Sequence, residues 1–163
     1  MERIAIYPGT FDPLTLGHFD LALRSAGIFD HIVLAVAEST PKSTLFTLEE
    51  RLALTREAVA GIENVEVDTF NGLLIDYLNN RRARVLIRGV RAFTDFEYEF
   101  QMALINRKLD PEIETLFMMP NETNSYISSS RIKEVAALGG DVARFLPENV
   151  ARAVKAKYSK DAS

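Results

Sequence analysis

The stretch YPGTFDPLTLGH, residues 7–18, connects the first predicted strand to the first predicted helix. The apolar run Ile4-Ala5-Ile6 precedes it and is typical of a strand buried on both faces, and a helix-like stretch over 18–29 follows. The stretch includes two glycines, two prolines, two threonines and one of the two histidines of the chain. Such a loop is either a tight turn with no further task or a loop built to hold a charged ligand.

Short β-rich runs alternate with helix-like runs along the rest of the chain. The predicted strands cover 3–7, 31–37, 64–70, 84–87 and 114–118, and the predicted helices cover 18–29, 48–60, 72–79, 94–109, 128–138 and 147–157. This alternation favours right-handed βαβ crossovers and a doubly wound, five-stranded parallel sheet. We therefore expect an α/β fold, with a single domain over 1–163 that ends in a helical segment at about 140–158.

Composition narrows the class of protein. The chain has 163 residues, of which 47% are hydrophobic and 26% charged, which suits one domain with a sizeable core. The net charge of −4 disfavours a sequence-independent nucleic-acid binder. There is no cysteine, no apolar run suited to a signal peptide and no membrane-spanning stretch. We expect a soluble cytoplasmic protein that binds neither nucleic acid nor membrane.

Ligands of doubly wound sheets bind beyond the carboxyl ends of the strands. We therefore expect the functional residues in the loops that follow the strands. In the first loop, Gly9 and Gly17 would let the backbone approach an anion. His18 would lie in the first helical turn, where its imidazole can face the same anion. The alternative is an ordinary turn in which Thr15 caps the helix and His18 is solvated.

Two arginines follow the fourth strand, in VLIRGVRAF. Arg88 and Arg91 have a glycine between them and could fork the oxygens of a phosphate. The alternative is a pair of surface arginines bound to acidic residues of the next helix, namely Asp95, Glu97 or Glu99. Their position directly after a buried strand favours phosphate binding.

Polar residues follow two further strands. Lys42, in STPKST, would normally be only solvated, but its loop belongs to the same predicted edge of the sheet. The run Ser128-Ser129-Ser130 opens a helix and offers several donors at its positive end. A single serine suffices for an N-cap, so redundant capping is the alternative. No HExxH motif, cysteine set or carboxylate cluster predicts a metal site held by the protein.

Four stretches together resemble the nucleotidyltransferase superfamily that has HxGH and ISSS motifs: GTFDPLTLGH, LIRGVRAFTDFEYE, NSYISSSRIKEV and FLPENV. Within it, they resemble the bacterial phosphopantetheine adenylyltransferases, in order and over nearly the whole chain. The first histidine of HxGH is Thr15 here, a replacement that also resembles this subfamily. It leaves His18 as the only imidazole candidate.

The resemblance implies a Rossmann-like nucleotidyltransferase fold and an enzyme of coenzyme A biosynthesis. Such enzymes transfer the adenylyl group of ATP to 4′-phosphopantetheine and release dephospho-coenzyme A and pyrophosphate. The resemblance also implies Mg²⁺ carried mainly by the ATP phosphates, and a cytoplasmic homohexamer. Two alternatives stay open: adenylyl or cytidylyl transfer to another small phosphate acceptor, and a non-catalytic nucleotide-binding module.

The resemblance also assigns roles to individual residues. Catalytic roles fall on His18, Lys42 and Arg91. The acceptor would be bound by Thr10, Lys42, Leu74 and Arg88. ATP would be bound by Thr10, Phe11, Gly17, His18, Gly89, Val90, Arg91, Glu99, Asn124, Ser125, Tyr126, Ile127, Ser128, Ser129 and Ser130. Without the resemblance, Leu74 could equally be a core leucine and Glu99 a solvated helix residue.

Overall fold

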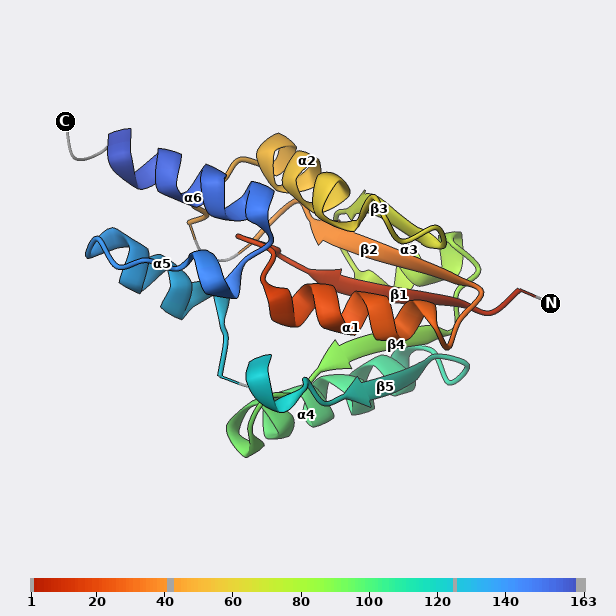
Figure 1. The fold of residues 1–163 in the computed structure, drawn as a ribbon. Helices are drawn as coiled ribbons and strands as arrows, with labels where there is room; N and C mark the ends of the chain where they lie inside the picture. Colours follow the sequence, from red (N-terminus) through yellow and green to blue (C-terminus); the bar gives the residue numbers. More distant parts are fainter. Residues whose placement is uncertain (1, 41–42, 125, 161–163) are drawn as a thin grey trace.

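The centre of the molecule is a sheet of five parallel strands: β1 (Ile4–Gly9), β2 (His31–Ala37), β3 (Val65–Phe70), β4 (Val85–Gly89) and β5 (Glu114–Met118). Their order across the sheet is β3-β2-β1-β4-β5 (Figure 1). This computed structural model describes residues 2–40, 43–124 and 126–160. All five predicted strands are confirmed, and β2 and β5 have the predicted bounds.

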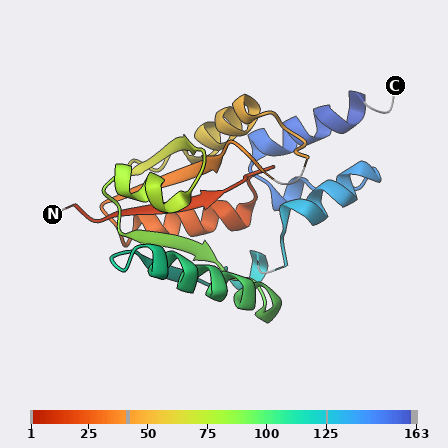
Figure 2. The same cartoon turned by 180° about the vertical axis from the view of Figure 1, so that it is seen from behind.

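Helices cover both faces of the sheet, which confirms the doubly wound prediction. They are α1 (Leu16–Ala26), α2 (Leu48–Val59), α3 (Leu74–Asn80), α4 (Phe93–Leu109), α5 (Ser129–Ala137) and α6 (Glu148–Lys160), with short 3₁₀ turns η1 (Glu122–Asn124) and η2 (Ala143–Phe145). Helices α1 and α2 lie on one face and α3 and α4 on the other (Figures 1 and 2). None of the described helices is long and apolar enough to cross a membrane.

The apolar run of β2 matches a sheet that has helices packed on both of its faces. Ile32, Leu34 and Val36 pack into the core beneath α1 and α2, whereas Val33 and Ala35 pack into the core that includes α3. Side chains alternate between the two faces of a strand, so a strand buried on both faces needs an unbroken apolar run. Burying each of the larger side chains contributes about 1.5–3 kcal/mol.

The strand order fixes where a ligand can bind. The chain fills the sheet outward from β1 to β3 and then crosses to β4, which pairs with β1 on its other side. Strand order therefore reverses between β1 and β4, and the loops that follow these two strands come to lie next to each other. A doubly wound sheet binds ligands at this switch point.

The carboxyl-terminal helices lie beyond the carboxyl ends of the strands (Figure 1). Helices α5 and α6 share a separate apolar cluster that includes Ile132, Val150 and Val154 and also takes in Phe46, just before α2. This cluster holds the amino end of α5 near the strand ends. The predicted helical segment at about 140–158 corresponds to η2 and α6; the assignment of one domain to 1–163 stays a prediction.

Candidate active site

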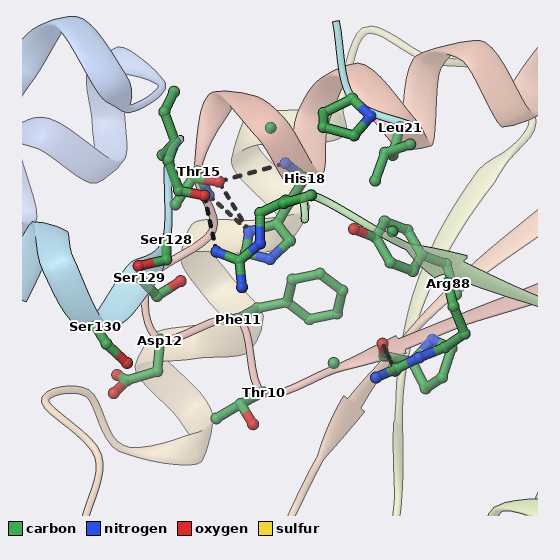
Figure 3. A pocket seen from close by; sticks show the side chains of 18 of the residues that line it. Thr10, Phe11, Asp12, Thr15, His18, Leu21, Arg88, Ser128, Ser129 and Ser130 are labelled. Atoms are coloured by element: carbon green, nitrogen blue, oxygen red, sulfur yellow. Dashed lines mark hydrogen bonds between the residues drawn. The ribbon is translucent and has the colours of Figure 1, made fainter. Parts of the chain in front are cut away.

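A cavity of about 560 Å³ opens at the carboxyl ends of β1 and β4 (Figure 3). Four segments that are distant in sequence line it: the loop after β1, the residues around 40–44 that the structure describes, the end of β4 with the start of α4, and the loop leading into α5. These are the segments that the sequence singled out. The fold therefore brings Arg88, Arg91 and the predicted hydroxyls to one place.

His18 is held by the cap of its own helix. The backbone N–H of Thr15 donates to Nδ1 of His18 at 3.0 Å, and the His18 N–H donates to the Thr15 hydroxyl at 3.3 Å (Figure 3). Thr15 thus caps α1, as the ordinary-turn alternative expected, but the same bonds also orient the imidazole. Because Nδ1 accepts a hydrogen bond, the proton of the neutral ring lies on Nε2.

The His18 ring stays neutral over a wide pH range. Burial lowers its pKa to about 4, and the positive charges of Arg91 and Arg88 act in the same direction. At neutral pH the ring therefore offers Nε2–H as a donor without carrying a positive charge.

Phe11 packs behind this imidazole. Its backbone lies in the left-handed region, with φ of 48°, and its ring meets the His18 ring edge-on at 5.2 Å. A Cβ on Gly9 would approach the Phe11 ring to 2.9 Å. Gly9 therefore makes room for this ring as well as lining the cavity. Backbone strain of this kind is concentrated at functional sites.

Arg88 is held by Glu99. Its Nε and Nη2 donate to the two carboxylate oxygens at 2.7 and 2.5 Å, and its Nη1 donates to the Pro8 carbonyl at 3.2 Å. Burial alone would lower the pKa of Arg88, but the pairing with Glu99 outweighs it and leaves that pKa raised. These bonds use three of the five guanidinium N–H groups, so the Nη edge retains donors for a phosphate.

Arg91 links two of the loops. Its Nη1 donates to the carbonyl of Ile127 at 3.0 Å, and its Nε lies 3.4 Å from Asp95. Both arginines are thus paired with acidic residues of α4, which was the alternative considered from the sequence. Both nevertheless line the cavity. The pair with Asp95 is half-exposed and contributes little to stability.

The three serines before and within α5 make different contacts. Ser128 caps the helix by accepting from the Arg131 N–H at 3.2 Å. Ser129 donates to the Pro13 carbonyl at 2.8 Å and so fastens α5 to the first loop. Ser130 lines the cavity at the same helix end. The arrangement leaves an amino-terminal helix end, which favours anions, at the cavity wall.

One partly buried ion pair of the site, between Asp12 and Lys133, was missed by the sequence analysis. The Asp12 carboxylate accepts from the backbone N–H groups of Leu45 and Phe46, both at 2.9 Å, and from Nζ of Lys133 at 2.8 Å. It thereby ties together the first loop, the segment just before α2, and α5. Lys133 stands four residues after Ser129, on the same face of α5, and this spacing was the signal available for it.

Several assigned residues are not among those that the structure places in the cavity lining. Lys42 and Ser125 are outside the described residues. Leu74 packs against the core beneath α3 and does not line the cavity. The Val90 N–H donates to the Met118 carbonyl, and the Tyr126 ring packs against Phe145 at 6.1 Å; neither lines the cavity. Conversely, the cavity is lined by two tyrosines that the sequence analysis did not assign, Tyr7 and Tyr98.

The described part of the chain contains no group of three or more histidine, aspartate or glutamate side chains that could hold a metal ion. The Asp12 carboxylate is already engaged with Lys133 and two backbone N–H groups. These residues do not form a dedicated Mg²⁺ site. Mg²⁺ carried by the ATP phosphates stays a prediction.

The sequence matches a known family and a named relative over most of its length. Residues 6–135 match the cytidylyltransferase-like family. A protein named phosphopantetheine adenylyltransferase from Methylococcus capsulatus (strain ATCC 33009 / NCIMB 11132 / Bath) is 55% identical over 159 residues, which cover 98% of each chain.

Solved structures share the fold at low sequence identity. A putative nicotinate-nucleotide adenylyltransferase from Vibrio parahaemolyticus has a TM-score of 0.72 at 19% identity, covering 94% of this chain and 99% of its own. A bifunctional NMN adenylyltransferase/ADP ribose pyrophosphatase from Francisella tularensis has a TM-score of 0.73 at 12% identity, covering 98% of this chain and 52% of its own. These likenesses confirm the Rossmann-like nucleotidyltransferase fold. Given its sequence match over nearly the full length, the chain belongs to the phosphopantetheine adenylyltransferase family, within the cytidylyltransferase-like proteins.

Proposed function

We propose that this chain transfers the adenylyl group of ATP to 4′-phosphopantetheine and releases dephospho-coenzyme A and pyrophosphate. The observation that carries the proposal is the convergence of three of the four family-like segments, those around the first loop, RGVRAF and ISSS, on one cavity at the switch point of the sheet. The 55% identity to a phosphopantetheine adenylyltransferase supports the same reaction.

The chemistry needs cations more than a base. An oxygen of the acceptor phosphate forms a bond to the α-phosphorus of ATP, and the bond from that phosphorus to the bridging oxygen breaks, so pyrophosphate leaves with the electron pair. A phosphomonoester is already largely dianionic at neutral pH, because its second pKa is about 6. The barrier comes from bringing two anions together, and catalysis rests on positioning and on stabilising charge in the transition state.

His18 is proposed as the donor at the reacting phosphorus. Its orientation supports this role, because Nδ1 is occupied by the Thr15 N–H and Nε2–H is left for the ligand. Arg91 and the amino end of α5 would bind the triphosphate together with Ser129 and Ser130. In this scheme ATP lies against the first loop, the Gly89–Arg91 segment and the loop before α5.

The acceptor phosphate is proposed to bind beside ATP, at Thr10, Lys42 and Arg88. Thr10 lines the cavity, and Arg88 retains N–H groups on its Nη edge. Leu74 would contact the pantetheine arm only at the rim, because it lies outside the cavity lining. Mg²⁺ would enter with the triphosphate and keep several waters.

We also propose a cytoplasmic homohexamer. Support for an oligomer comes from α4, where Phe96, Phe100 and Leu104 are spaced four residues apart and all remain at least 40% exposed in the single chain. The Phe96 and Phe100 rings stack at 5.7 Å and extend the apolar surface along the helix. A contiguous apolar surface of this kind marks a protein contact.

The test is a pyrophosphate-release assay with ATP, Mg²⁺ and a panel of acceptors: 4′-phosphopantetheine, nicotinamide mononucleotide and glycerol phosphate. We expect turnover with 4′-phosphopantetheine and a loss of about 10²–10⁴-fold in kcat for His18→Ala. His31→Ala is the matched control, because His31 bonds Glu66 at the opposite ends of the strands. Wild-type turnover with another acceptor alone, or binding of ATP without turnover, would overturn the proposal.

A further inference from the structure

Arg51 is a buried cation outside the cavity lining. It lies on α2 with 3% of its surface exposed, and its Nη1 donates to two backbone carbonyls, that of Thr10 at 2.9 Å and that of Ala37 at 2.8 Å. Within the described residues, no carboxylate pairs with it. Its buried Nε has no acceptor there either. Burying an incompletely satisfied guanidinium is costly, and such groups in native structures call for an explanation.

The two carbonyls explain what the guanidinium does. Ala37 is the last residue of β2, and Thr10 directly follows β1, which pairs with β2 up to Gly9 and Val36. Beyond this point the strands separate, and their carbonyls lose the ladder partners. One nitrogen of Arg51 bridges the two diverging ends, so it fixes the spacing between Thr10 and Ala37, from which the two loops start.

The same arrangement leaves a positive charge directly behind the first loop. A phosphate dianion bound at Thr10 would supply the counter-charge that Arg51 lacks among the residues that the structure describes. Electrostatic interactions are strong in such a low-dielectric setting, even without direct contact. Among the described segments proposed to bind ATP, Arg51 donates a hydrogen bond to the first loop alone, at the Thr10 carbonyl; its other bond goes to Ala37, at the end of β2.

We propose that Arg51 is a positioning residue for the acceptor phosphate: through the carbonyls of Thr10 and Ala37 it sets the two loops that receive this phosphate, and its charge favours the dianion. The inference rests on the proposed function in one respect, the identity of the acceptor. A residue that only closed the core would affect stability without distinguishing the two substrates.

The test compares Arg51→Met and Arg51→Lys with wild type, measuring kcat, the KM for each substrate and Tm. We expect Arg51→Met to raise the KM for 4′-phosphopantetheine by about tenfold or more and the KM for ATP by less than about threefold. Arg51→Lys keeps the positive charge but replaces the planar guanidinium by a single ammonium group. We expect its KM for 4′-phosphopantetheine to lie between those of wild type and Arg51→Met.

Thr55→Val is the matched control. Thr55 lies one turn along the same face of α2, is fully buried, and its hydroxyl also lacks a partner among the described residues. It should leave both KM values within about twofold, whatever it does to Tm, because it changes no charge and removes no described hydrogen bond to either loop. Equal changes in the two KM values for the Arg51 variants, or a fall in Tm with both KM values intact, would overturn the proposal.

Failure of the proposed function would be visible separately. If the wild-type chain does not turn over 4′-phosphopantetheine, binding of inorganic phosphate is measured by calorimetry for wild type, Arg51→Lys and Thr55→Val. Weaker binding by Arg51→Lys than by the other two supports the positioning role. Equal binding by all three overturns it.

Discussion

The backbone N–H of Thr15 donates to Nδ1 of His18 across 3.0 Å, so one side chain both caps α1 and faces the cavity. A capping box usually carries glutamate or glutamine at the third helical position. Histidine can replace them because Nδ1 is an acceptor, and the second ring nitrogen is then left for another task. The cap and the proposed catalytic function can be separated by substitutions that keep only one of the two nitrogens.

His18→Asn should separate them. The asparagine oxygen can accept from the Thr15 N–H in place of Nδ1, but no donor remains where Nε2–H was. We expect kcat to fall by about 10²–10⁴-fold, while Tm stays close to that of wild type. His18→Ala should lose the cap as well, at a cost of about 1 kcal/mol. Kinetics and thermal unfolding of both variants provide the measurement, and near-normal kcat in His18→Asn would remove Nε2 from the mechanism.

The pKa of His18 predicts a pH dependence of stability. An unfolded histidine titrates near 6.5, whereas burial lowers the pKa of His18 to about 4 in the folded chain. Between these values the unfolded state binds a proton that the folded state does not. The free energy of unfolding therefore falls as pH drops from 6.5 to about 4, and this contribution is fully present above pH 6.5.

Two measurements check this dependence. Denaturant unfolding across pH 4–7 should show a smaller decline for His18→Asn than for wild type, because asparagine does not titrate. An NMR titration of the ligand-free protein should show a neutral His18 ring at pH 6. A His18 resonance that titrates near pH 6.5 would contradict the predicted shift.

The Glu99 carboxylate has two possible roles, binding ATP or holding Arg88, and a substitution can distinguish them. The resemblance assigns it to ATP, but in the structure it holds Arg88 through two charge-assisted bonds. If Arg88 binds the acceptor phosphate, Glu99→Gln should raise the KM for 4′-phosphopantetheine by about tenfold, the effect of losing one charge-assisted bond. The KM for ATP should change by less than about threefold.

Glu97→Gln is the control for this comparison, since Glu97 is exposed on the same helix and does not line the cavity. It should leave both constants within about twofold of wild type. A rise confined to the KM for ATP in Glu99→Gln would restore the assignment of Glu99 to the nucleotide.

The helices, the strands and the edge of the sheet that bears the site could be predicted from the sequence. Particular residues show why. The apolar run of β2 and the Thr47–Glu50 capping box are local signals, because each depends on residues close together in the chain. In the structure the strand has its predicted bounds, and the Glu50 carboxylate accepts from the Thr47 N–H at 2.9 Å. Strand order is not a local property, because no feature of the β1 or β4 sequence indicates that these two strands pair. The placement of the first loop next to RGVRAF therefore had to come from the structure.

Long-range polar pairs were beyond the sequence for the same reason. Asp12 and Lys133 stand 121 residues apart and meet only because α5 docks over the strand ends. Arg51 donates to backbone carbonyls. Every residue has such a carbonyl, so the sequence does not indicate which ones an arginine binds. The sequence offered Glu99 as one of three possible acidic partners of the arginines but could not select it, because its bond to Arg88 depends on how α4 packs against β4.

The apolar stripe on α4 predicts assembly. A hexamer would have six times the 18.3 kDa mass of the chain, and light scattering during size-exclusion chromatography measures that mass directly. Leu104→Glu should shift the mass to a smaller species, because a charge in the contact is desolvated without a partner. Leu23→Glu is the matched control, since Leu23 is 49% exposed on α1, compared with 50% for Leu104. A wild-type mass of one chain, or the same large mass for Leu104→Glu as for wild type, would show that this face of α4 is not the contact that assembles the protein.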